Sequence, residues 1–271
     1  MSLVLVAHGT RRPSGLAMVG DLAEHVSALV GQAVQVAFVD VLGPAPSEVL
    51  ANLSARHPVS GDHEPVIVLP AFLSRGYHVR VDLPAHIAAS GHPNVTVIPA
   101  LGPDAEVARI VGHQLVESGW RPGDSVILAA AGTSDHNART DLHTTAVLLS
   151  ALTGSRVRLG FAATGDPDVG EAVADARRHT ARRVVVASYL LADGLFQERL
   201  HTCGADLVTQ PLSTHPRLAR LIAHRFLRAL PRGSVRHRPY PLPNSAARRA
   251  CRQGTSAERR RPLPPAQERA K

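Results

Sequence analysis

Lysine is almost absent from this chain, whose only lysine among 271 residues is Lys271. A P-loop needs a lysine for the phosphates in its GxxxxGK[ST] motif, so this class of nucleotide site is excluded from residues 1–230. Schiff-base chemistry, which also requires a lysine, is excluded with it. We therefore expect any reaction catalysed here to proceed without ATP bound at a Walker site.

Cysteine and long apolar runs are scarce as well. The two cysteines, Cys203 and Cys251, form no CxxC motif, so neither a disulfide framework nor an iron–sulfur or structural zinc site is expected. No run approaches the roughly 18 to 20 apolar residues of a membrane span. The opening residues Met1-Ser2-Leu3-Val4 lack the charged leader of a signal peptide. We expect a cytoplasmic protein without a membrane partner.

Positive charge is concentrated at the end of the chain. The formal net charge is +8 and the pI is near 10.8, but residues 231–271 alone carry +9, which leaves −1 for residues 1–230. Because this segment is rich in Pro, Arg, Ser and Ala, we predict a disordered, solvated tail. A basic tail can bind nucleic acid or a membrane weakly. With no aromatic residue beyond Tyr240 in the segment, we expect no nucleic-acid partner.

Apolar runs alternate with amphipathic stretches through the first part of the chain. The expected strands are residues 3–7, 34–39, 66–69 and 95–98, and the expected helices are residues 13–30, 46–53, about 84 onward, and 105–116. Continuous apolar runs such as residues 66–69 are typical of strands buried on both faces. The alternation predicts an α/β fold with a mostly parallel sheet and right-handed crossovers.

The pattern stops near residues 119–123 and then starts again. Residues 125–133 resemble residues 3–10, and residues 184–196 resemble residues 66–78. A repeat of roughly 115 residues is too long for a solenoid and indicates a duplicated domain. We therefore predict two tandem similar α/β domains, residues 1–118 and 124–230, followed by the tail at 231–271.

Two histidines follow buried strands, which distinguishes them from the other thirteen. His8 comes after the first strand and His78 after the third, and the second copy has Ala131 and Phe196 in their places. Open α/β sheets bind ligands beyond the carboxyl ends of their strands, so we expect both imidazoles in one crevice. Imidazole suits borderline divalent metals and accepts a proton near neutral pH.

Simpler and competing interpretations stay open at this point. His8 could merely form a hydrogen bond at a strand-to-helix turn. His136 and His143 lie seven residues apart, with Asp135 and Asp141 nearby, and could form a second metal pair. Neither the spacing of that pair nor its position supports the idea strongly, so His8 and His78 are the stronger candidates.

Two motifs resemble those of a known family. His8-Gly9-Thr10-Arg11-Arg12-Pro13, together with residues 70–84, PAFLSRGYHVRVDLP, resembles the sirohydrochlorin chelatases, which are class II chelatases that insert a divalent metal into a tetrapyrrole without ATP. The resemblance covers residues 1 to about 230. It implies a chelatase-like fold, with His8 and His78 as the catalytic pair that binds metal and accepts protons. It also implies no permanently bound cofactor, because the Fe²⁺ or Co²⁺ ion is a substrate.

The resemblance also assigns roles to acidic residues near the two histidines. A carboxylate after the second strand often joins the pair in this family, and Asp40 has that position here. The family more usually has Glu, so Asp40 is either a metal ligand or a cap of the following loop. Asp82 lies four residues after His78 and either orients the imidazole as a hydrogen-bond acceptor or complements the start of a helix.

Arginines are expected to bind the carboxylates of the tetrapyrrole. An arginine fork pairs with a carboxylate through two hydrogen bonds. Four arginines cluster in sequence around the two histidines, although any of them could be a surface charge: Arg11, Arg12, Arg75 and Arg80. We expect the tetrapyrrole to lie between the two copies, against an apolar wall that the second copy supplies.

The hypothesis is therefore a sirohydrochlorin chelatase, with iron slightly preferred by analogy with duplicated single-chain enzymes of sirohaem biosynthesis. A cobaltochelatase of cobalamin biosynthesis is the main alternative. A non-catalytic tetrapyrrole or metal carrier on the same fold is another. A third alternative is a metal-dependent hydrolase or lyase that retains its metal. The sequence does not fix the oligomeric state, and a monomer is compatible with it.

Overall fold

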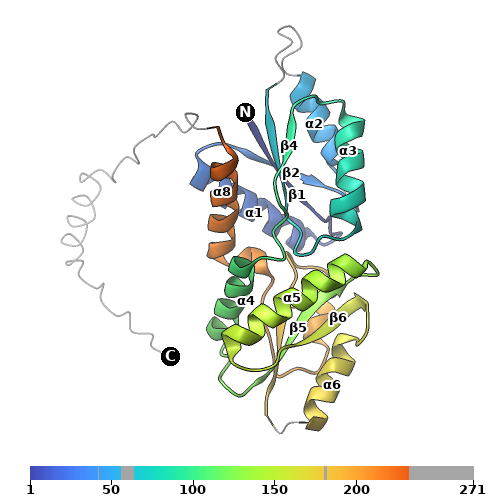
Figure 1. Ribbon diagram of the computed structural model, residues 1–271, viewed down its shortest axis with the longest axis vertical. Helices are drawn as coiled ribbons and strands as arrows, with labels where there is room; N and C mark the ends of the chain where they lie inside the picture. The colour runs from blue at the N-terminus through green and yellow to red at the C-terminus, as the bar shows by residue number, and fades with distance from the viewer. Residues whose placement is uncertain (42, 56–63, 180–181, 232–271) are drawn as a thin grey trace, which may run out of the picture. The chain divides into compact units, whose positions relative to one another are not determined.

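Two parallel sheets flanked by helices make up residues Met1–Leu230, which form one compact unit (Figure 1). The computed structural model describes residues 1–41, 43–55, 64–179 and 182–231. The predicted tail therefore lies outside the described residues, apart from Pro231. Within the described part of the chain, no helix is both long and apolar enough to span a membrane.

The described residues of the first half form four strands and four α-helices in alternation, as predicted. Its elements are β1 (Ser2–Ala7), α1 (Pro13–Val30), β2 (Val34–Phe38), α2 (Pro46–Ala55), β3 (Val66–Pro70), η1 (His78–Asp82), α3 (Leu83–Ser90), β4 (Val95–Val97) and α4 (Ala105–Glu117). The strands pair in parallel in the order β2-β1-β3-β4. Because β1 and β3 are neighbours, the segments that follow them begin side by side at one edge of the sheet.

Both faces of this first sheet are covered, which explains its continuous apolar strands. Val4 and Val68 pack in a cluster with residues of α2 and α3. Leu5 and Leu69 alternate with them and pack on the other face, in the main core with α1 and α8. Side chains alternate across a strand, so a strand buried on both faces needs apolar residues at every position.

The second half repeats this arrangement. Its elements are β5 (Ser125–Gly132), α5 (His136–Thr153), β6 (Arg158–Thr164), α6 (Val169–His179), β7 (Val184–Tyr189), α7 (Leu195–His201), β8 (Leu207–Val208), η2 (Leu212–Thr214) and α8 (Pro216–Ala229). The strand order, β6-β5-β7-β8, matches that of the first sheet. The predicted fold class, two similar α/β units with parallel sheets, is confirmed.

The helix that closes each half packs on the other half. Figure 1 shows α4 beside α5 and α8 beside α1. Helix α4 also contacts β7, and α8 also contacts β3. The main core accordingly contains side chains from both sheets, such as Leu69 and Leu128, together with Phe226 of α8. The two halves share this core, and a turn with Gly119 and Gly123 at positive φ connects them.

The helix after β3 begins earlier than predicted. It starts at His78 with a π-helical turn, η1, instead of near Pro84, and the Leu83 N–H donates to the carbonyl of His78. Proline has no N–H, and its ring crowds the carbonyl four residues back, so the wider turn relieves a clash that a regular α-helix would have here. His78 is consequently a residue of a helical turn instead of the preceding loop.

Candidate metal-binding site

His8 and Asp40 lie close together because Gly9 allows the loops that follow their strands, β1 and β2, to approach each other. A Cβ atom on Gly9 would lie 2.0 Å from the carbonyl oxygen of Asp40, so only glycine allows the loops after β1 and β2 to approach this closely. The approach brings Asp40 Oδ2 to 3.9 Å from His8 Nε2. The next residue, Val41, has φ 74°, a left-handed conformation that is strained for a β-branched side chain.

The Asp40 carboxylate has contacts that fit both roles considered for it. Its Oδ1 accepts a hydrogen bond of 2.7 Å from the N–H of Val41, which holds the strained turn. Its Oδ2 is directed at His8 and forms no hydrogen bond with the loop residues that the structure describes. One oxygen therefore caps the loop while the other is available to a metal ion.

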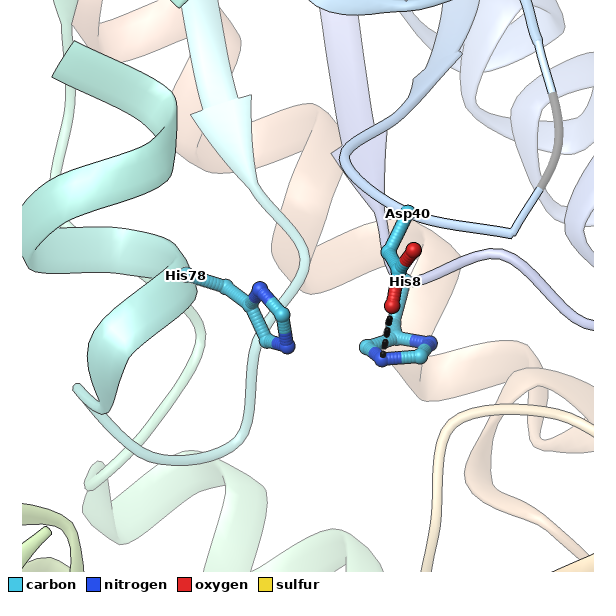
Figure 2. Close-up of side chains that lie close together, drawn as sticks. All are labelled: His8, Asp40 and His78. Carbon is cyan, nitrogen blue, oxygen red and sulfur yellow. Dashed lines mark ion pairs between the residues drawn. The ribbon is translucent and has the colours of Figure 1, made fainter. Parts of the chain in front are cut away.

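His78 is oriented by a carboxylate one turn along its helix. Asp82 Oδ2 lies 2.6 Å from His78 Nδ1, the contact that an orienting acceptor requires. The ring also stacks against Phe72, with centroids 6.1 Å apart. Figure 2 shows the His78 ring directed from η1 toward the His8 ring. The two ring centroids are 4.8 Å apart, with the planes at 78°.

Both imidazoles present the same nitrogen to the site. His8 Nδ1 lies 2.8 Å from the carbonyl oxygen of Gly9, and His78 Nδ1 contacts the Asp82 carboxylate. A carbonyl oxygen and an ionised carboxylate only accept hydrogen bonds, so each Nδ1 carries the proton of its neutral ring. Each Nε2 therefore keeps a free lone pair, which can bind a metal ion or accept a proton.

His8, Asp40 and His78 together offer ligand atoms that all lie within 4.8 Å of one another. The side chains of His8 and Asp40 are 45% and 58% exposed, so an ion can enter from solvent and leave again. Among residues 1–41, 43–55, 64–179 and 182–231, no other group of three such ligands is this close. The competing pair, His136 and His143, is thus without a third ligand in the described structure.

The site opens into a cavity of about 780 Å³ between the two halves. The first half contributes His8, His78 and Phe72 to its lining, and the second half contributes Phe196. Two alanines of the second half, Ala131 and Ala163, line it as well. Both histidines of the cavity thus lie on one side, whereas the other side is largely apolar, with Asp193 and Tyr189 as its titratable residues.

The four arginines predicted to bind substrate divide into two pairs. Arg11 and Arg12 line the cavity, whereas Arg75 and Arg80 do not. Arg80 forms an ion pair with Asp135 across the two halves, at 3.7 Å. The placement of Arg75 and Arg80 therefore differs from the one expected of substrate-binding residues.

Arg75 joins the two halves through a buried carboxylate. Asp141, whose side chain is 3% exposed, accepts hydrogen bonds from the Arg75 backbone N–H, from Nε at 3.0 Å and from Nη2 at 2.6 Å. The hydrogen bonds and charge of Asp141 raise the pKa of the Arg75 guanidinium above its ordinary value. Asp141 therefore neutralises this guanidinium and occupies the fork formed by its Nε and Nη2.

Sequence reasoning missed the partners of these arginines and two apolar residues of the cavity. Tyr77 and Leu195 line the cavity, are 60% and 53% exposed, and immediately precede His78 and Phe196. An alignment of the two copies of the repeat would have identified them, because it places Tyr77 and Leu195 at the same position, directly before the matched residues His78 and Phe196. The same alignment matches Arg12 with Asp135, and Arg80 with Glu198.

Comparisons with known proteins agree with this architecture. The CbiX family model matches residues 2–118 and, a second time, residues 125–229. A sirohydrochlorin cobaltochelatase of Priestia megaterium is 26% identical over 240 residues, covering 83% of this chain and 74% of that protein. Another, of Methanothermobacter thermautotrophicus, is 31% identical over 97 residues, covering 34% of this chain and 64% of that protein.

Solved structures share the fold. SirB from Bacillus subtilis with Fe³⁺ has a TM-score of 0.69 at 19% identity, covering 84% of this chain and 94% of that one. The sirohydrochlorin chelatase SirB from Bacillus subtilis subspecies spizizenii, in complex with cobalt, has a TM-score of 0.63 at 22% identity, covering 86% and 97%. Because the two family matches span most of the chain, this protein belongs to the CbiX family, the class II chelatase family that its two motifs resemble.

Proposed function

We propose that this protein inserts a divalent metal ion into sirohydrochlorin without ATP, using His8 and His78. The observation that carries the proposal is the group of His8, Asp40 and His78, whose ligand atoms lie within 4.8 Å of one another at the edge of a large cavity. Membership of the CbiX family supports a tetrapyrrole of the sirohydrochlorin class as the substrate. The metal ion is a substrate that passes through the site.

The chemistry requires a metal ligand and a base at the same place. Two pyrrole N–H protons must leave as the metal enters the macrocycle. His8 Nε2 and His78 Nε2 both have free lone pairs, so they can hold the ion and then accept one proton each as it departs. In this proposal Asp40 is the third ligand, and Asp82 fixes the tautomer of His78 through its Nδ1.

The cavity walls suit a flat, carboxylate-rich ligand. We propose that Tyr77 and Leu195, exposed on opposite halves, contact the faces of the macrocycle. Arg11 and Arg12 then bind its carboxylates. We assign Arg75 and Arg80 instead to holding the halves together, because both are paired with carboxylates of the second half.

We further propose that residues 1–118 and 124–230 descend from one duplicated unit and that only the first retains the chemistry. The matching strand orders support this division. The second unit supplies the apolar wall of the cavity, through Ala131, Ala163 and Phe196.

Iron is the metal that we expect from the duplicated single-chain architecture, which would make the product sirohaem. Cobalt is the alternative, and the names of the curated relatives, sirohydrochlorin cobaltochelatases, favour it. Imidazole and carboxylate ligands accept both ions. The choice between the two therefore depends on measurement.

The test is anaerobic absorbance of sirohydrochlorin with the full-length protein and either Fe²⁺ or Co²⁺, against a control without protein. We expect the spectral change of metal insertion to be faster with protein than without it, and the faster ion identifies the pathway. Tight pigment binding with no acceleration for either ion would contradict the proposal and indicate a carrier. Metal retained through purification would instead favour a hydrolase or lyase with a resident ion.

A further inference from the structure

Two ion pairs join the halves at matched positions of the repeat. The position that carries the cation in one pair carries the anion in the other. Arg12 immediately precedes α1 and pairs with Glu198 at 2.7 Å. Asp135 immediately precedes α5 and pairs with Arg80 at 3.7 Å. Arg80 and Glu198 also match, since each lies two residues after His78 or Phe196. Each half therefore contributes one residue to each pair, and the cation comes from the first half both times.

The two pairs differ in their relation to the cavity. Arg12 lines it, whereas Asp135 and Arg80 do not. The side chains of Arg12 and Glu198 are 53% and 49% exposed, so water and ions reach this pair. Neighbouring Arg11 also lines the cavity and has no ion-pair or hydrogen-bond partner among the residues that the structure describes. Arg11 is thus free to bind an anion, whereas Arg12 is occupied by a carboxylate of the protein itself.

We propose that Glu198 is an internal competitor of the substrate, which a carboxylate of the tetrapyrrole displaces from Arg12 on binding. This inference rests on the proposed function. The Glu198 side chain presents to Arg12 the same chemical group that the substrate carries. An exposed ion pair contributes little to stability, so the exchange of one carboxylate for another is inexpensive. Glu198 then lowers the affinity for any ligand whose carboxylate must take its place, and it acts as a specificity-determining residue.

The test compares Glu198→Gln with a matched control, Asp135→Asn. Each variant removes one negative charge from one of the two equivalent ion pairs. Asparagine at position 135 preserves the N-cap of α5, where the side chain accepts from Asn137 and Ala138. The measurement is the Kd for metal-free sirohydrochlorin, by anaerobic absorbance titration of the full-length protein.

We expect Glu198→Gln to tighten pigment binding by roughly 1.5- to five-fold, the range set by an exposed ion pair. Asp135→Asn should leave the Kd unchanged, because Arg80 does not line the cavity. Arg12→Gln should weaken binding, and adding Glu198→Gln to it should change nothing further, since the competitor acts only through Arg12.

Three results would overturn the inference while leaving the proposed function intact. They are an unchanged or weaker Kd for Glu198→Gln, an equal tightening by Asp135→Asn, and a full effect of Glu198→Gln without Arg12. Equal tightening by both variants would reveal a general effect of net charge. A wild-type protein that binds no sirohydrochlorin would instead overturn the proposed function and this inference with it.

Discussion

The two halves have the same scaffold and differ in the residues that face the cavity. In each half the second strand pairs a phenylalanine with an alanine of the first strand, Ala7 with Phe38 and Ala130 with Phe161. The N–H of each phenylalanine donates to the carbonyl of a proline six residues later, at 2.9 and 3.1 Å. The loop that positions Asp40 in the first half is therefore present in the second, with Ala163 at the corresponding place.

The second half thus lacks all three candidate ligands at once. The matched residues are His8 and Ala131, Asp40 and Ala163, and His78 and Phe196. The replacements are apolar, and all three line the same cavity. The comparison teaches that both halves build the cavity with the same strand order and loops, whereas only the first half has the three side chains that could bind a metal ion.

Removing either imidazole should have the largest effect. We predict that His8→Ala and His78→Ala each lower the rate of metal insertion by about 100-fold or more, because each variant removes a ligand and a base. The anaerobic absorbance assay measures this rate. His143→Ala is the matched control, since His143 is exposed on α5 and outside the cavity lining. A comparable loss of insertion rate in His143→Ala would indicate that the metal site lies in the second half instead.

Asp40 should have the next largest effect, and asparagine separates its two roles. Asp40→Asn keeps an acceptor for the Val41 N–H but loses the charge directed at His8. We predict a loss of about 10- to 100-fold in kcat/KM for the metal in Asp40→Asn, and partial retention of activity in Asp40→Glu. Steady-state rates at varied metal concentration measure both. Full activity in Asp40→Asn would show that Asp40 only caps its loop.

The buried contact between Asp141 and Arg75 is charged, whereas its counterpart in the repeat is not. The equivalent backbone N–H, that of Asp193, lies 3.4 Å from the sulfur of Met18. Asp141→Asn weakens hydrogen bonds to a charged group that is half exposed, so we predict a loss of about 1–2 kcal/mol in the free energy of unfolding. Met18→Leu should cost less than Asp141→Asn, and below about 1.5 kcal/mol, because it exchanges side chains of similar volume.

Urea denaturation measures both variants. The comparison fails if Met18→Leu destabilises the protein more than Asp141→Asn does. In that case the packing of α1, and not the ion pair, would dominate this junction.

The caps of the two closing helices should respond differently to acid. Asp104 caps α4, accepting from the Glu106 N–H at 2.7 Å. His215 caps α8 through Nδ1, which accepts from the Arg217 N–H at 3.2 Å. Burial of His215, which is 4% exposed, lowers its pKa below the ordinary value of 6.5. Only the neutral ring can accept, so α8 loses its cap when His215 takes up a proton.

The direction of the pH effect follows from linkage. A histidine whose pKa is lowered in the folded state does not reduce the free energy of unfolding at pH values above its unfolded-state pKa. It reduces the free energy of unfolding as the pH falls below that pKa, which is about 6.5. We predict that His215→Asn, which keeps a capping acceptor, reduces the fall in unfolding free energy between about pH 7 and 5.5 by up to about 1 kcal/mol. An unchanged pH profile would show that this cap does not titrate in that range.

The sequence was sufficient to predict the elements that depend on local patterns. Buried apolar runs identified β1 and β3, and the rule for strand ends brought His8 and His78 together. The start of η1 was missed, because the effect of Pro84 on the preceding turn depends on the geometry of the backbone. The partners of Arg75 and Arg80 were missed for a different reason. These partners lie on the other half. Local periodicity does not show that α4 and α8 each pack on the half to which they do not belong.

The most direct test of the central assignment is metal insertion by the His8→Ala/His78→Ala double variant, measured beside its binding of metal-free sirohydrochlorin. We predict that the double variant still binds the pigment, because the arginines and the apolar walls of the cavity remain, and that its insertion rate equals that of the control without protein. An insertion rate well above that control would contradict the assignment of the chemistry to the two histidines of the first half.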